Sequence, residues 1–144
     1  MADMTGGKAV IESLMAQGVD TAFGVISIHM MAVYDALYDV QDRFRFISAR
    51  HEQAAVYEAD GYARATGKPG ICFTSTGPGA ANTLGAMGEA WSASSPVLHF
   101  HHDHFRREYG LQHIKKCISP KGSCIRGLKT ISDRYTHIAG ISNR

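Results

Sequence analysis

Cysteine, proline and long apolar runs are all scarce in this sequence of 144 residues. Its three cysteines, Cys72, Cys117 and Cys124, form no CxxC pair. Their odd number argues against a disulfide framework, so we expect a reducing compartment. No signal peptide or membrane span is apparent, because Glu12 and Gln17 interrupt the apolar pattern of the first segment. These absences exclude a disulfide-rich secreted domain and a membrane protein, and we expect a cytoplasmic chain.

Charge is unevenly distributed along the chain. Residues 1–98 carry six basic and ten acidic side chains, whereas residues 99–144 carry nine basic and three acidic ones and six of the eight histidines. A basic tail can mark a nucleic-acid arm. Regular interleaving with aromatic residues is missing from this tail, so we expect no nucleic-acid partner. The 44% hydrophobic content is enough for the core of about one domain.

Helix and strand patterns alternate through residues 5–100. Apolar periodicity predicts helices at 6–17, 30–38, 51–66 and 80–91, and short apolar runs predict strands at 20–25, 44–48, 70–75 and 95–100. This order predicts an α/β fold, with a parallel sheet flanked by helices on both faces. Beyond residue 100 the pattern stops. We therefore expect an incomplete domain at 1–100, truncated after about four strands, and an atypical tail at 101–144.

Each of the first three predicted strands is followed by an unusual segment, at 26–29, 49–53 and 76–79. In a parallel sheet all three emerge at the same edge, where ligands bind in open α/β folds. Glu52 falls at a strand exit and a helix start, so it is either a catalytic acid or a charge that favours the helix dipole. The segment from Thr76 to Gly79 is either a phosphate cradle or a structural turn.

Three motifs resemble one known family in order and spacing. They are RHEQAA at 50–55, ADGYARATG at 59–67 and TSTGPGAAN at 74–82. Together they resemble the N-terminal, pyrimidine-binding domain of thiamine-diphosphate enzymes of the acetolactate synthase and pyruvate oxidase type. The resemblance extends from Thr5 to about Leu98 and implies the thiamine-diphosphate-binding fold. It is specific for the family and says little about the substrate.

The resemblance implies a catalytic role for Glu52. In the family, the matching glutamate hydrogen-bonds N1′ of the cofactor's aminopyrimidine ring. A proton shared there promotes removal of the proton from thiazolium C2, and the cofactor then acts as an electron sink for a 2-oxo acid. A carboxyl group in an apolar cleft suits this proton transfer. The resemblance therefore favours the catalytic interpretation of Glu52.

The resemblance also implies that other parts of the cofactor are bound elsewhere. Family members hold the diphosphate and Mg²⁺ with a separate domain, through a Gly-Asp-Gly motif that this sequence lacks. A flavin (FAD) would be possible only in a full-length parent. We expect a homo- or hetero-oligomer with a diphosphate-binding domain or chain and a small 2-oxo acid as substrate. The residues expected on the pyrimidine side are Ile26, Ser27, Glu52, Thr76, Gly77, Pro78, Gly79 and Asn82.

Several alternatives stay open. Ile26 and Ser27 stand where many acetolactate synthase-like members have Pro-Gly, so the particular reaction is open, and His29 faces either the substrate or a chain contact. The chain could be a small subunit that supplies Glu52 to a separate diphosphate-binding chain. Residues 99–104 have the pattern H-x-H-x-D-H, which resembles the metal motif of metallo-β-lactamase-like hydrolases. The tail could equally result from a shifted reading frame.

Overall fold

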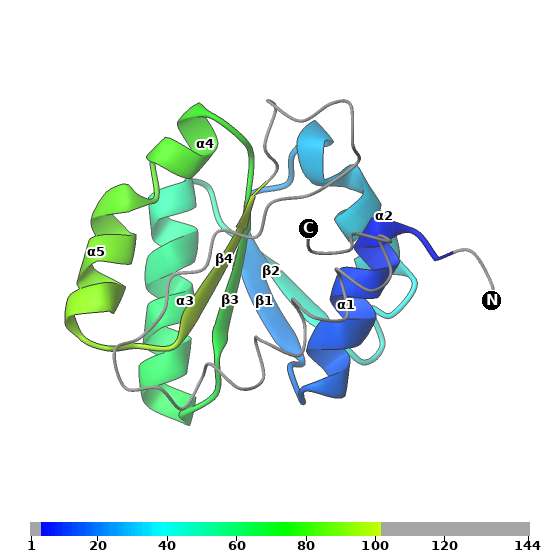
Figure 1. The fold of residues 1–144 in the computed structure, drawn as a ribbon, viewed down its shortest axis with the longest axis horizontal. Helices are drawn as coiled ribbons and strands as arrows, with labels where there is room; N and C mark the ends of the chain where they lie inside the picture. Colours follow the sequence, from blue (N-terminus) through cyan, green and yellow to red (C-terminus); the bar gives the residue numbers. More distant parts are fainter. Residues whose placement is uncertain (1–3, 102–144) are drawn as a thin grey trace, which may run out of the picture.

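The computed structural model describes residues 4–101. Within this range the chain alternates between helices and strands (Figure 1). The helices are α1 (Gly6–Ala16), the 3-10 turn η1 (Ile28–Met30), α2 (Met31–Tyr38), α3 (Glu52–Thr66), α4 (Pro78–Ala81) and α5 (Leu84–Ser92). The strands are β1 (Thr21–Gly24), β2 (Arg45–Ser48), β3 (Gly70–Thr74) and β4 (Val97–His101). None of the helices in this range is long and apolar enough to cross a membrane.

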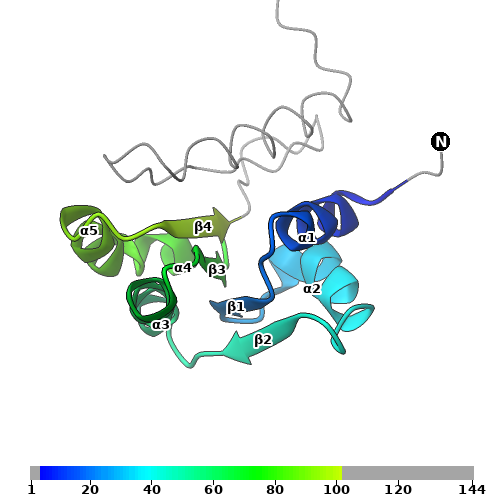
Figure 2. The same cartoon turned by 90° about the horizontal axis from the view of Figure 1, so that it is seen from below.

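The four strands form one parallel sheet in the order β2-β1-β3-β4. Helices α1 and α2 cover one face of the sheet, and α3, α4 and α5 lie on the other (Figure 2). This arrangement confirms the predicted α/β fold with helices on both faces. It arises because a parallel pair needs a crossover connection, and the helices of these crossovers bury both sides of the sheet.

Successive strand residues point to opposite faces, so each face has its own core. Thr5 caps α1 by accepting a hydrogen bond from the Lys8 amide, and this helix buries its apolar side against the sheet. The α1/α2 face contains Val10, Ile11, Leu14, Val33, Leu37, Ile71, Phe73, Leu98 and Phe100, among others. The α3/α5 face contains Phe23, Ala55, Val56, Ala59, Cys72, Ala86, Met87, Ala90 and Val97. Cys72 is fully buried on this face, where its side chain packs as a small apolar residue.

The segment between β3 and β4 forms two helices instead of the single helix predicted at 80–91. Helix α4 ends at Ala81, and α5 begins at Leu84. Between them the buried Thr83 turns its hydroxyl back to the carbonyl oxygen of Ala80, at 2.7 Å. A threonine that bonds the preceding backbone competes with the regular helix ladder, which explains the break. The break sets Asn82 at the end of α4, beside the first turn of α3.

The second motif serves to join α3 to its neighbours. Asp60 is buried on α3 and forms a two-pronged ion pair with Arg64 one turn later, at 2.7 Å and 3.0 Å. The same guanidinium contacts Glu89 of α5 at 3.0 Å. A Cβ atom at Gly70 would lie 2.1 Å from the carbonyl oxygen of Ala59, so only glycine allows β3 to start this close to α3. These contacts fix the position of α3, and hence of Glu52, over the sheet.

Candidate functional site

The order of the strands creates a switch point at the carboxyl edge of the sheet. From β1 the chain crosses to β2 on one side, whereas β3 and β4 lie on the other side. Hydrogen bonds from the Val25 amide to Phe73 O (3.1 Å) and from the Ala49 amide to Gly24 O (2.8 Å) keep the strand exits together. Ligands of open α/β sheets bind at such a switch point. The three exits predicted to converge do so here.

Glu52 begins helix α3 directly after the exit from β2, as predicted. His51 precedes it with an extended backbone, and its Nδ1 accepts a hydrogen bond from the Gln53 amide (3.2 Å), which caps the helix. The Glu52 carboxylate is half-buried and accepts a hydrogen bond at Oε2 from Asn82 Nδ2, at 3.0 Å. Its position at a helix N-terminus favours negative charge. The contact with Asn82 shows that the exits of β2 and β3 meet at this carboxylate.

Gly79 forms the other side of the carboxylate's surroundings. A Cβ atom at this position would lie 3.0 Å from Glu52 Oε1 and 2.9 Å from Ser75 Cβ. The loop reaches this place through Gly77, whose φ of 58° favours glycine, and through Pro78 at the start of α4. The small residues of this loop therefore bring backbone, not side chain, against Glu52.

The exit of β1 combines exposed apolar side chains with an unsatisfied hydroxyl. Ile26 and Ile28 are 61% and 80% exposed. Between them, Ser27 Oγ is buried and has no hydrogen-bond partner within residues 4–101. Tyr34 of α2 donates a hydrogen bond to Val25 O at 2.9 Å, and burial raises the pKa of its phenol. The hydrogen bond from Tyr34 thus anchors this segment to α2, while Ile26 and Ile28 face solvent.

His29 and Ser75 connect the exits of β1 and β3. His29 Nδ1 lies 3.2 Å from Ser75 Oγ, although the two residues are 46 positions apart in the sequence. Ser75 was not among the residues predicted for the site. The available signal was its place directly after a buried strand, at the edge where the exits converge.

The residues predicted for the site fall into two groups. Asn82 donates a hydrogen bond to Glu52, Gly79 lies beside the same carboxylate, and Thr76, Gly77 and Pro78 belong to the loop that carries Gly79. Ile26 and Ser27 lie on the neighbouring exit, and no hydrogen bond within the described range joins them to Glu52. Their place in the site stays a prediction.

His99 of the H-x-H-x-D-H segment is a core residue of β4. It is buried, and its Nε2 lies 2.7 Å from the hydroxyl of the equally buried Thr74. Burial, together with nearby His101, lowers the pKa of His99 to about 4. Residues 102–104 lie outside the described range, and within residues 4–101 no cluster of three or more potential ligands could hold a metal ion.

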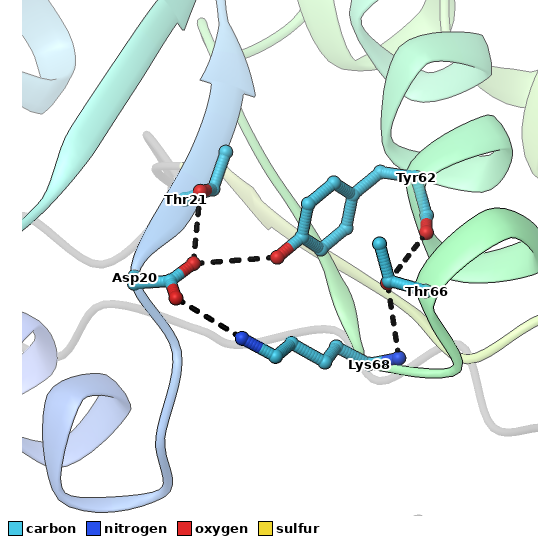
Figure 3. A network of polar contacts seen from close by, with 5 residues as sticks. All are labelled: Asp20, Thr21, Tyr62, Thr66 and Lys68. Carbon is cyan, nitrogen blue, oxygen red and sulfur yellow. Dashed lines mark hydrogen bonds and ion pairs between the residues drawn. The ribbon is translucent and has the colours of Figure 1, made fainter.

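A second polar cluster lies at the amino edge of the sheet (Figure 3). The Asp20 carboxylate accepts hydrogen bonds from Lys68 (3.0 Å), Thr21 (2.9 Å) and Tyr62 (3.3 Å). The bond from Lys68, followed by that from Thr21, lowers the pKa of Asp20. Beside this cluster is an open cavity of about 350 Å³, lined by Asp20, Thr21, Gln41, Asp42, Arg43, Phe44, Arg45 and Tyr62. Because Glu52 lies at the opposite edge, this cavity is not the candidate site.

Gly79→Ala should disturb the site more than a comparable change nearby. The new methyl group would overlap Ser75 and the Glu52 carboxylate, and we expect a loss of about 1 to 3 kcal/mol in the free energy of unfolding. It should also shift the side-chain amide signals of Asn82 in NMR spectra. Gly85→Ala is the matched control, because its Cβ would make only an ordinary contact, 3.6 Å from Gln53 Nε2. Equal effects of the two changes would contradict the packing of Gly79 against Glu52.

Comparison with known proteins identifies similarity over most of the chain. The model of the family described as "Thiamine pyrophosphate enzyme, N-terminal TPP binding domain" matches residues 4–122. A probable 2-ketoarginine decarboxylase of Pseudomonas aeruginosa is 44% identical over 95 residues, which are 66% of this chain and 17% of that protein. The acetolactate synthase isozyme 2 large subunit of Escherichia coli is 46% identical over 95 residues, which are 66% of this chain and 17% of that protein.

A probable acetolactate synthase large subunit of Methanocaldococcus jannaschii is 45% identical over 95 residues, or 66% of this chain and 16% of that protein. The chain thus spans about one sixth of the length of these curated relatives. Among solved structures, benzoylformate decarboxylase from Polynucleobacter necessarius superposes with a TM-score of 0.60 and 25% identity. That match covers 68% of this chain and 18% of the other.

Proposed function

The chain belongs to the thiamine pyrophosphate enzymes, in the family of their N-terminal TPP-binding domain, and on this premise we propose that it supplies the pyrimidine-binding half of a 2-oxo acid decarboxylase or synthase site. The observation that carries the proposal is the Glu52 carboxylate at the carboxyl edge of the sheet, between Gly79 and Asn82. A carboxyl group in this place can hold and release a proton at the cofactor's pyrimidine ring.

The residues at this edge fit the pyrimidine part of the cofactor. Gly79 has no side chain, and a Cβ atom at this position would fill the space next to the Glu52 carboxylate. A flat ring could therefore approach Glu52. Ser27 Oγ is a buried hydroxyl without a partner in the described range, and Ile26 offers apolar surface beside it. An unsatisfied buried hydroxyl costs about 1 to 3 kcal/mol, which a bound ligand could offset. Apolar surface with a few placed polar groups is typical of cofactor sites.

The same edge does not fit the diphosphate and its Mg²⁺. Magnesium prefers carboxylates and phosphate oxygens in octahedral geometry. Residues 4–101 contain no cluster of three or more potential ligands, and Glu52 is already engaged with Asn82. We therefore propose that another domain or chain holds the diphosphate and Mg²⁺, so that the complete site lies between two surfaces.

In this proposal each residue has a defined task. Bound thiamine diphosphate supplies an electron sink at its thiazolium carbon. Glu52 holds a proton at N1′ of the pyrimidine ring and exchanges it during turnover. Asn82 Nδ2 fixes the carboxylate through Oε2, and Gly79 keeps the approach to it open. The chain's contribution is thus orientation and proton transfer.

The proposed partner would cover the exposed apolar residues of the β1 exit. Ile26 and Ile28 project into solvent beside the site, which suits a surface that becomes buried in an assembly. The partner is a diphosphate-binding domain of the same enzyme, in a homo-oligomer, or a separate chain to which this one is a small subunit. The contact surface is the same in both cases.

Reconstitution tests this function. The acceptor is the E. coli acetolactate synthase isozyme 2 large subunit with its own N-terminal domain removed, mixed with the complete 144-residue chain, thiamine diphosphate and Mg²⁺. We expect CO₂ release from a 2-oxo acid only when both proteins are present. As a control for the acceptor, its own N-terminal domain, added separately, should restore activity. Restoration by that domain but not by this chain would contradict the proposal.

A further inference from the structure

The cavity at the amino edge of the sheet, called the amino-edge cavity below, has no role in the proposed thiamine diphosphate site. Its volume of about 350 Å³ is within the range of pockets that bind small molecules. The start of β1, the connection from α2 to β2 and one side chain of α3 line it, so three separate elements meet there. Figure 3 shows the side of the cavity formed by Asp20, Thr21 and Tyr62.

Both acidic residues of the amino-edge cavity already have cationic partners. The Asp20 carboxylate accepts hydrogen bonds at both oxygens, from the Lys68 ammonium and from two hydroxyl groups. The Asp42 carboxylate lies 3.7 Å from Nε of Arg43, and both side chains are largely exposed, so solvent screens their charges. The cavity therefore has little unmatched negative charge, and we do not expect a cation there.

Arginine side chains supply unmatched positive charge. Within residues 4–101 the Arg45 guanidinium has no hydrogen bond or ion pair, and Arg43 has only the long contact with Asp42. Phe44, which separates the two arginines, is buried in the α1/α2 core, whereas both arginines line the cavity. Residues two positions apart have Cα atoms at most about 7 Å from each other. Two guanidinium groups therefore line one cavity a short distance apart.

Two guanidinium groups at this spacing match a ligand with two carboxylates. A guanidinium binds a carboxylate through two parallel hydrogen bonds, a geometry that an ammonium group lacks. A ligand with one carboxylate would leave the second guanidinium unmatched, whereas two carboxylates joined by a short hydrocarbon chain could contact both. The side-chain amide of Gln41, which also lines the cavity, has no partner within the described range and could donate to a remaining carboxylate oxygen.

We propose that the amino-edge cavity binds a small dicarboxylate, with one carboxylate on Arg43 and the other on Arg45. The hydrogen bonds of Asp20 join the start of β1 to Tyr62 and Lys68, so this wall of the cavity is fixed before a ligand binds. The inference does not depend on the proposed function, because none of these residues contacts Glu52 or the loop of Gly79.

The test is an NMR titration of the isotope-labelled 144-residue chain with succinate and with glutarate. Butyrate, which has the length of succinate but one carboxylate, and succinamide, which has no charge, are the matched probes. We expect saturable shifts at Arg43, Arg45 and Tyr62 with either dicarboxylate. Butyrate should bind roughly 10- to 100-fold more weakly, the effect of losing one hydrogen-bonded ion pair, and succinamide should give no saturable shift. Equal affinities for succinate and butyrate, or shifts centred on Glu52 and Gly79, would overturn the proposal.

Substitutions test the two guanidinium groups directly. Arg43→Gln and Arg45→Gln should each weaken succinate binding by roughly 10- to 100-fold. Arg45→Lys keeps the charge but not the forked donors, so it should restore only part of the affinity. Arg50→Gln is the matched control, because Arg50 is also exposed but lies beyond the other end of β2 and does not line the cavity. An unchanged affinity in Arg45→Gln, or an equal loss in Arg50→Gln, would show that the cavity is not the binding site.

Discussion

Glu52→Gln should slow exchange of the C2 proton of thiamine diphosphate by about 10²- to 10⁴-fold in the reconstituted enzyme, the range typical of losing a general acid or base. Glutamine has the same shape and still accepts a hydrogen bond from Asn82. Its amide cannot take up and release a proton at the pyrimidine ring. The exchange rate, followed by NMR in deuterated water, therefore isolates the proton transfer from folding and from substrate binding.

The fold should tolerate this substitution. The Glu52 carboxylate is half-buried and its hydrogen bond to Asn82 is exposed, so we expect the free energy of unfolding to change by no more than about 1 kcal/mol. Asn82→Ala is a useful comparison, because it removes the donor and leaves the carboxyl group. It should lower the exchange rate less than Glu52→Gln. An unchanged exchange rate in Glu52→Gln would refute the catalytic role of Glu52.

Acidification should destabilise the chain through His99. Its pKa is lowered to about 4 in the folded state, compared with about 6.5 when unfolded, by burial and by His101. Below pH 6.5 the unfolded chain takes up a proton that the folded chain excludes. The contribution of neutral His99 to the free energy of unfolding is thus complete above pH 6.5. It decreases as the pH falls towards 4, by about 3 kcal/mol in total.

The measurement is urea unfolding of the wild type and of His99→Gln at several pH values between 7 and 4. Glutamine keeps a donor for Thr74 but does not titrate, so the difference between the two proteins cancels the contribution of the carboxylates. We expect the free energy of unfolding of the wild type, relative to that of His99→Gln, to fall by about 3 kcal/mol between pH 7 and pH 4. His101→Gln is the matched control and should keep most of the wild-type dependence. Parallel pH dependences of the wild type and His99→Gln would show that His99 is not buried as a neutral group.

Local patterns were sufficient to predict the framework that holds Glu52. The alternation of apolar strands with amphipathic helices predicts the parallel sheet, and a carboxylate directly after a strand predicts the start of α3. Helix α4 begins at Pro78, whose fixed φ and missing donor suit the first turn of a helix. These features depend on residues close in the sequence, which is why they could be recognised.

Contacts between distant residues could not be predicted in the same way. The bond between Asn82 and Glu52 depends on the break at Thr83, which no apolar pattern reveals. The pair formed by His29 and Ser75 depends on the order of the strands. His99 was placed in a metal-like motif by its spacing alone, whereas its environment is set by Thr74 on the neighbouring strand. The hydrogen-bond partners of these side chains are determined by tertiary packing and not by their neighbours in the sequence.

The central claim is that this chain forms the pyrimidine half of a divided thiamine diphosphate site. The most direct test is a titration of the isotope-labelled 144-residue chain with thiamine and, separately, with thiamine diphosphate and Mg²⁺, followed through its backbone amide signals. We predict that both ligands shift the same signals, those of Ser27, Glu52, Gly79 and Asn82, with affinities within a few-fold of each other. Much tighter, Mg²⁺-dependent binding of the diphosphate, or shifts centred on Asp20 and Tyr62 at the opposite edge, would contradict the claim.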